Sequence, residues 1–215
     1  MLKPDRAAIG VAVLLGFIPF CAFAASLSAV ITDQDGNPVE DAVIYIESIN
    51  GTKPLFAAEA FDVDQIDKTY VPHVRVITKG STVSFPNSDD IRHHVYSFSD
   101  ARTFELPLYI GTPAEPVRFD EAGVVDLGCN IHDFMRAYIL VLETPYYGKS
   151  VGGELQIDGF DDGVIDLAVW HPRMFGDELL RQQVEISSTH QLQLELQLRG
   201  ESNTGRAPKR RKKRY

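Results

Sequence analysis

The sequence predicts an all-β protein made of two β-sandwiches, and three observations support this prediction. From residue 26 onward the chain consists of short runs rich in Val, Ile, Tyr and Phe, which favour strands over helices. Gly, Pro, Asn and Asp separate these runs at short, regular intervals, as in sandwiches and barrels. A helical period is weakly present over 173–183 alone.

The composition agrees with a folded, globular chain. The 215 residues are 44% hydrophobic and 24% charged, which is enough for one or two domains with apolar cores. This composition excludes disordered, collagen-like and coiled-coil proteins.

The expected strands follow in order along the chain. Strands at 27–32 and 42–47 flank the turn-rich segment 33–38, so we expect them to form a hairpin. Further strands are expected at 71–77, 82–85, 94–98, 117–119, 123–127 and 137–142. After Thr144 and Pro145 the pattern begins again, with strands at 154–157, 164–170, 183–187 and 191–198 and a tight turn at 159–163.

The N-terminus resembles a secretory signal peptide. Lys3 and Arg6 precede an apolar run at 7–25, and Ala22-Phe23-Ala24 forms a small-residue cleavage site. We therefore predict a signal peptide over 1–24 and export of the mature chain. An uncleaved anchor and a lipid anchor on Cys21 are the alternatives.

Export leaves the mature chain with one cysteine, Cys129. Exported thiols are normally paired in disulfides. Cys129 therefore forms an intermolecular disulfide, lies inert in the core or is held by a metal as a thiolate.

Charge is distributed unevenly along the chain. The net charge is −9, to which 1–24 contributes +1 and 206–215 contributes +7, so the body carries −17. We expect 200–215 to be a disordered basic tail, or alternatively to contact an anionic surface. A body with this negative charge repels phosphate, so we expect no nucleic-acid partner.

One short segment carries the strongest chemical signal. Cys129, His132 and Met135 lie within seven residues, between the strands expected at 123–127 and 137–142. Soft sulfur ligands with imidazole select copper, and two His, one Cys and a weak axial Met make the blue-copper ligand set. Zinc is a weaker candidate because a thioether is a poor zinc ligand. The second histidine is expected from the pair His93 and His94.

These residues resemble the cupredoxin family. Cys129-x2-His132-x2-Met135 with a distant upstream histidine is similar to the cupredoxin ligand set, with the short Cys-to-Met loop of amicyanin. The segments 85–97 and 128–132 look like those of bacterial periplasmic cupredoxin-like proteins often labelled methylamine-utilisation proteins. The resemblance covers about 53–143. It implies a Greek-key β-sandwich, one type 1 copper ion, one-electron transfer to a redox protein partner, and the periplasm.

The resemblance also implies the ligands. His93, Cys129, His132 and Met135 are the expected metal ligands. Adjacent strand residues point to opposite faces, so His94 is either the ligand in place of His93 or a supporting group that braces the cysteine loop. Core packing remains the alternative role for each residue taken singly.

No catalytic residue is expected, because six histidines are too few for a second histidine-rich copper site. His73, His171 and His190 are interpreted as structural or surface residues. The alternative function is a copper-binding or structural interaction module of the cell envelope that transfers no electrons.

The flanks resemble a second domain. Segment 26–46 is similar to the first half of a carboxypeptidase regulatory-like, or transthyretin-like, domain, and 153–169 to its second half. We therefore predict that 25–52 and 145–199 form one split sandwich, into which a cupredoxin domain over 53–144 is inserted. The alternative is a single larger sandwich with a strand pair added at each end.

Overall fold

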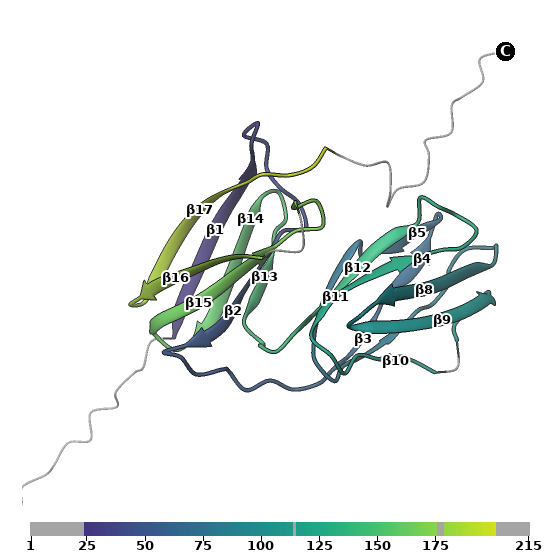
Figure 1. The fold of residues 1–215 in the computed structure, drawn as a ribbon, viewed down its shortest axis with the longest axis horizontal. Coiled ribbons are helices and arrows are strands. Elements are labelled where there is room, and N and C mark those ends of the chain that lie inside the picture. The colour runs from purple at the N-terminus through teal and green to yellow at the C-terminus, as the bar shows by residue number, and fades with distance from the viewer. Residues whose placement is uncertain (1–23, 114, 176–178, 201–215) are drawn as a thin grey trace, which may run out of the picture.

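The computed structural model describes residues 24–113, 115–175 and 179–200. Every regular element in these ranges is a β-strand (Figure 1), so the all-β prediction is confirmed. Part of the weak helical pattern at 173–183 belongs to the strand β16 (Leu180–Ile186). The described ranges contain no helix that could cross a membrane. The predicted signal peptide and basic tail lie outside them, apart from residues 24 and 200.

Two facing sheets form what we call the flanking sandwich. One has the strand order β14 (Glu154–Phe160), β1 (Ala25–Asp33), β17 (Thr189–Leu196). The other has the order β13 (Tyr147–Lys149), β2 (Val43–Ile49), β15 (Gly163–Trp170), β16. Buried side chains from both sheets, including Leu27, Ile44 and Ile165, make one apolar core.

The expected hairpin at 27–47 is wrong. β1 pairs with β14 and β17, whereas β2 pairs with β13 and β15. Segment 33–38 does turn, since Oδ1 of Asp33 accepts hydrogen bonds from the backbone N–H groups of Asp35 and Asn37. The turn carries the chain to the facing sheet because Leu27 and Ile44 bury their side chains in the same core from opposite sides.

The remaining strands form what we call the central sandwich. Its five-stranded sheet has the order β6 (Val74–Thr78), β12 (Arg136–Leu142), β11 (Gly123–Gly128), β8 (His93–Ser99), β9 (Arg102–Tyr109). A smaller sheet has the order β10 (Val117–Arg118), β7 (Thr82–Ser84), β3 (Ala60–Asp62), and a hairpin joins β4 (Asp64–Ile66) to β5 (Thr69–Val71). A second buried core, with Phe85, Phe119 and Leu127, fills this sandwich.

Five strands have no counterpart in the sequence prediction: β3, β4, β5, β9 and β13. Four of them are three residues long, too short to show a period. β9 is an edge strand with little burial and contains Pro107, features that weaken a strand signal.

Strand ladders do not cross between the two sandwiches in the described chain. β3 to β12 pair among themselves, and β1, β2 and β13 to β17 pair among themselves. The outer face of the five-stranded sheet meets the outer face of the β2 and β15 sheet (Figure 1). Eight buried residues fill the contact: Val43, Tyr45, Val74, Val76, Leu140, Leu142, Ala168 and Trp170. Independent folding of segment 53–144 stays a prediction.

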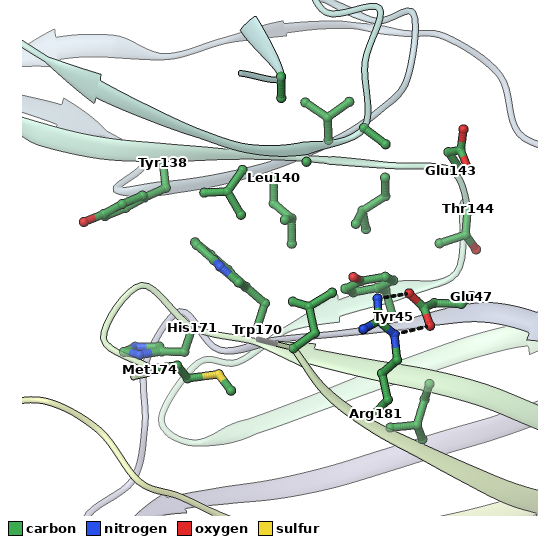
Figure 2. A pocket seen from close by; sticks show the side chains of 18 of the residues that line it. Tyr45, Glu47, Tyr138, Leu140, Glu143, Thr144, Trp170, His171, Met174 and Arg181 are labelled. Carbon is green, nitrogen blue, oxygen red and sulfur yellow. Dashed lines mark hydrogen bonds and ion pairs between the residues drawn. The ribbon is translucent and has the colours of Figure 1, made fainter. Parts of the chain in front are cut away.

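A cleft of about 1300 Å³ opens beside this contact (Figure 2). The Trp170 ring projects toward Tyr138 across it, edge to face, with 5.8 Å between ring centroids. An ion pair between Arg181 and Glu47 lines the side of the flanking sandwich. Trp170 is buried, as a core residue at the end of a strand should be.

Candidate metal centre

Neighbouring strands bring the expected ligands to one end of the central sandwich. His93 begins β8, Cys129 directly follows β11, and Met135 directly precedes β12. β11 lies between β8 and β12 and runs antiparallel to both. The loop 129–135 is therefore beside the start of β8.

Three donor side chains converge there. His93, Cys129 and His132 each offer a ligand atom, and these atoms lie within 4.8 Å of one another. Sγ of Cys129 is 3.8 Å from Nδ1 of His132. The rings of His93 and His132 are 5.0 Å apart between centroids. Cys129 is buried and forms no disulfide within the described chain.

The His93 ring has one satisfied and one unsatisfied nitrogen. Nε2 lies 2.6 Å from Oδ2 of Asp89. Nδ1 is buried and has no hydrogen-bond partner among the described residues. An unpaired buried polar atom is costly, and Nδ1 of His94 is unpaired among the described residues as well. Only His93 lies beside the Cys129 and His132 donors, so its free nitrogen points to a ligand. A metal ion held with the Cys129 thiolate fits that requirement.

Asp89 is itself held by the backbone. The turn between β4 and β5 donates the N–H groups of Asp67 and Lys68 to its carboxylate, at 2.7 and 2.9 Å. Burial alone would raise the pKa of Asp89. The pKa is nevertheless lowered below its ordinary value by hydrogen bonds from the Lys68 N–H, the His93 ring and the Asp67 N–H. The ionised carboxylate therefore accepts a hydrogen bond from Nε2, which leaves the lone pair on Nδ1.

His132 is half-buried in the loop. Burial, followed by the neighbouring His93 ring, lowers its pKa below the ordinary histidine value. A neutral imidazole is the form that binds a metal. Hydrogen bonds from His132 N to Cys129 O and from Met135 N to His132 O shape the loop.

Met135 is fully buried and packs in the same core as Cys129. It therefore lies on the core side of the loop, where packing also favours an apolar side chain. A role for its thioether as a metal ligand stays a prediction.

His94 lies outside the donor cluster. Its Nε2 is 2.8 Å from Oε1 of Glu105 on β9, and its ring packs near Tyr96. Its side chain contacts β9 because adjacent strand residues point to opposite faces, which turns His94 away from His93. A bracing role for His94 toward the cysteine loop stays a prediction.

The other three histidines lie elsewhere in the fold. The Nδ1 atom of His73 is 3.1 Å from Arg136 O, and Nε2 of His171 is 3.1 Å from Glu40 O. Burial lowers the pKa of His171 to about 4. His190 is half-buried on β17.

Sequence reasoning assigned no role to Asp89 or to Gly128. A Cβ atom on Gly128 would lie 2.6 Å from Cζ of Tyr96, closer than packing allows, so a larger residue before Cys129 would require the half-buried Tyr96 ring to move. In the sequence, the signal for the close approach of Gly128 to Tyr96 was a glycine next to a candidate ligand. The signal for Asp89 was a carboxylate four residues before His93.

Comparisons with known proteins assign no family to this chain. No family model and no curated protein matches the chain. A novel purple cupredoxin from Nitrosopumilus maritimus is 20% identical over 40% of this chain and 100% of its own, with a TM-score of 0.34. A reduced Cu(I) form of an amicyanin variant is 24% identical over 48% of this chain and 100% of its own, with a TM-score of 0.35. A pseudoazurin from Sinorhizobium is 21% identical over 40% of this chain and 76% of its own, with a TM-score of 0.32. Similarities with TM-scores this low assign no function to the chain.

Proposed function

We propose that this protein binds one type 1 copper ion and carries single electrons. The observation that carries the proposal is the buried Nδ1 of His93, which has no hydrogen-bond partner in the described part of the chain and lies beside the Cys129 thiol and the His132 ring. Two imidazoles and a thiolate are the trigonal donor set of type 1 copper, with a thioether as the weak fourth ligand. Met135 supplies that thioether.

Each residue has a distinct task in this proposal. Copper bound here would supply a one-electron redox couple. His93 and His132 would hold it through neutral nitrogens, and Cys129 would hold it through the deprotonated thiol. Asp89 keeps the His93 proton on Nε2. Burial of His93 and Cys129 excludes water from the site.

Zinc fits the donor set less well. Zinc sites close with four nitrogen, sulfur or carboxylate ligands, whereas the fourth candidate here is Met135. The described residues contain one cluster of three or more His, Cys, Asp or Glu side chains. We therefore propose an electron carrier with no catalytic reaction of its own.

We also propose export to the periplasm and a redox protein as partner. The support is the signal-like segment 1–24 and Cys129, which is unpaired in the described chain and which a metal would protect from oxidation. The half-buried His132 is the donor residue nearest to solvent and is proposed as the site of electron exit.

The test is the visible spectrum of the purified chain during titration with Cu(II). We expect an intense thiolate-to-copper absorption band at one equivalent, which bleaches with ascorbate and returns with ferricyanide. Cys129→Ser should remove the band, whereas Ser99→Ala, away from the loop, should retain it. Tight copper binding without this band would favour the non-redox copper module, and no binding would overturn both functions.

A further inference from the structure

The backbone ladder alone does not set the separation between the two ligand-bearing strands. β8 carries His93 and β11 leads into Cys129, yet these strands share one ladder pair, Gly128 with Tyr96. By contrast, β11 pairs with β12 along its whole length. Beyond Gly128, another contact must hold the ends of β8 and β11 together.

The side chain of Tyr70 makes such a contact. Tyr70 lies on β5, outside the five-stranded sheet, and is 1% exposed. Its hydroxyl oxygen is 2.9 Å from the carbonyl oxygen of Gly128 and 3.2 Å from that of His94. Gly128 precedes Cys129, and His94 follows His93. One hydroxyl therefore joins the two strands beside both ligands.

The chemistry of this hydroxyl suits a permanent donor. Burial, and secondarily the nearby Cys129 side chain, raises the pKa of Tyr70 well above the ordinary tyrosine value. The phenol keeps its proton and shares it between the two carbonyl oxygens. These carbonyls would otherwise be buried with fewer donors, which is unfavourable.

The hairpin that carries Tyr70 also supports the other side of the site. Its turn donates the Asp67 and Lys68 N–H groups to Asp89, which holds His93. Residues 64–71 therefore bond to Asp89 in the loop before β8, to the His94 carbonyl on β8 and to the Gly128 carbonyl on β11. The hairpin is positioned to set the geometry of the whole donor group.

We propose that Tyr70 is a positioning residue that sets the separation of His93 and Cys129. The inference rests on the proposed copper function but concerns this chain's own contacts. Loss of the hydroxyl should leave both ligands in place while loosening their separation. The consequences are a changed copper–thiolate geometry and a more accessible thiol.

The experiment compares Tyr70→Phe with Tyr45→Phe in the full chain. Tyr45 is the control because it is also a buried tyrosine but lies on β2 of the flanking sandwich, away from the donor group. For Tyr70→Phe we expect copper affinity to fall roughly tenfold to a hundredfold, the range for losing a contact that orients a ligand. The relative intensities of the copper–thiolate bands should also change. Tyr45→Phe should match the wild type in both.

A metal-free measurement separates this proposal from the copper function. In the apo protein, alkylation of Cys129 should be faster in Tyr70→Phe than in Tyr45→Phe at equal stability. Faster alkylation in Tyr70→Phe, together with no copper binding by the wild type, would overturn the proposed copper function but retain the positioning role of Tyr70. The positioning role would be overturned if Tyr70→Phe alkylated at the wild-type rate. If the chain binds copper, wild-type band intensities in Tyr70→Phe would overturn it as well.

A second variant covers a failure of Tyr70→Phe to fold. Tyr70→4-aminophenylalanine restores N–H donors toward the same two carbonyls and should return the bands and the alkylation rate to wild-type values. Altered values in this folded variant would overturn the proposal.

Discussion

Nε2 of His93 lies 2.6 Å from Oδ2 of Asp89, and the other nitrogen of the same ring is buried without a hydrogen-bond partner in the described chain. The carboxylate therefore decides which nitrogen of His93 is available. Asp89 belongs to the loop before β8 and is fixed by N–H donors from the turn between β4 and β5.

Asp89→Ala should weaken copper binding. Without the carboxylate, the His93 ring can rotate or carry its proton on Nδ1, and loss of such an orienting partner typically costs tenfold to a hundredfold in metal affinity, to order of magnitude. Competition titration with a copper chelator measures the change. Asp90→Ala is the control because Asp90 is exposed and adjacent. Equal affinity in the two variants would show that Asp89 does not orient His93.

Met135→Leu should keep the copper–thiolate band and raise the reduction potential. Leucine fills the buried site but removes the thioether, and the axial ligand tunes the potential of type 1 copper. Protein-film voltammetry of the variant and the wild type measures the shift. An unchanged potential would assign Met135 to packing alone.

His171 should make the apo protein less stable in acid. Burial lowers its pKa from 6.5 to about 4, so between these values the unfolded chain binds a proton that the folded chain does not. The free energy of unfolding therefore falls as pH decreases through this window, by roughly 3 kcal/mol in all at about 1.4 kcal/mol per pKa unit.

Urea unfolding of the apo protein at the two ends of this window measures the effect. His171→Gln removes the titration and should lose less stability on acidification than the wild type. His190 is half-buried on β17, and His190→Gln should lose as much stability on acidification as the wild type. Equal acid losses in His171→Gln and the wild type would contradict the prediction.

Segment 53–144 should bind copper when expressed alone. It contains all the strands from β3 to β12 and every proposed ligand. Excision exposes Val74, Val76, Leu140 and Leu142, which the flanking sandwich covers in the full chain. An apolar face of this kind promotes association, so we expect a blue fragment that self-associates.

Leu140→Gln with Leu142→Lys should convert that fragment to a blue monomer, as measured by sedimentation. The two substitutions place polar groups on the uncovered face and leave the ligands untouched. A fragment that is unfolded with and without them would contradict an autonomous inserted domain.

Deleting residues 206–215 should leave copper binding and the unfolding midpoint unchanged. Seven basic residues in this segment cannot contribute to an apolar core. If the segment contacts an anionic surface, the full chain should bind anionic vesicles more tightly at low salt, where screening is weaker, and the truncated chain should bind little. Equal vesicle binding by both chains would leave the tail a solubilising extension.

The sequence by itself predicted much of the fold and the donor set. The all-β class followed from strand-forming runs between turn residues. Cys129, His132 and Met135 could be found together because one short loop carries all three, and such a loop keeps its residues close in any fold.

Tertiary structure decided what depends on residues far apart in the sequence. That His93 and not His94 joins the donor cluster depends on which face of β8 meets the cysteine loop. The roles proposed for Asp89 and Tyr70 depend on a hairpin of three-residue strands, too short to show a pattern. The hairpin expected at 27–47 was wrong because strand pairing also depends on residues far apart in the sequence. Alternation along a strand records which side chains are buried, but not which strand lies beside it, because pairing partners are chosen by the packing of the whole core.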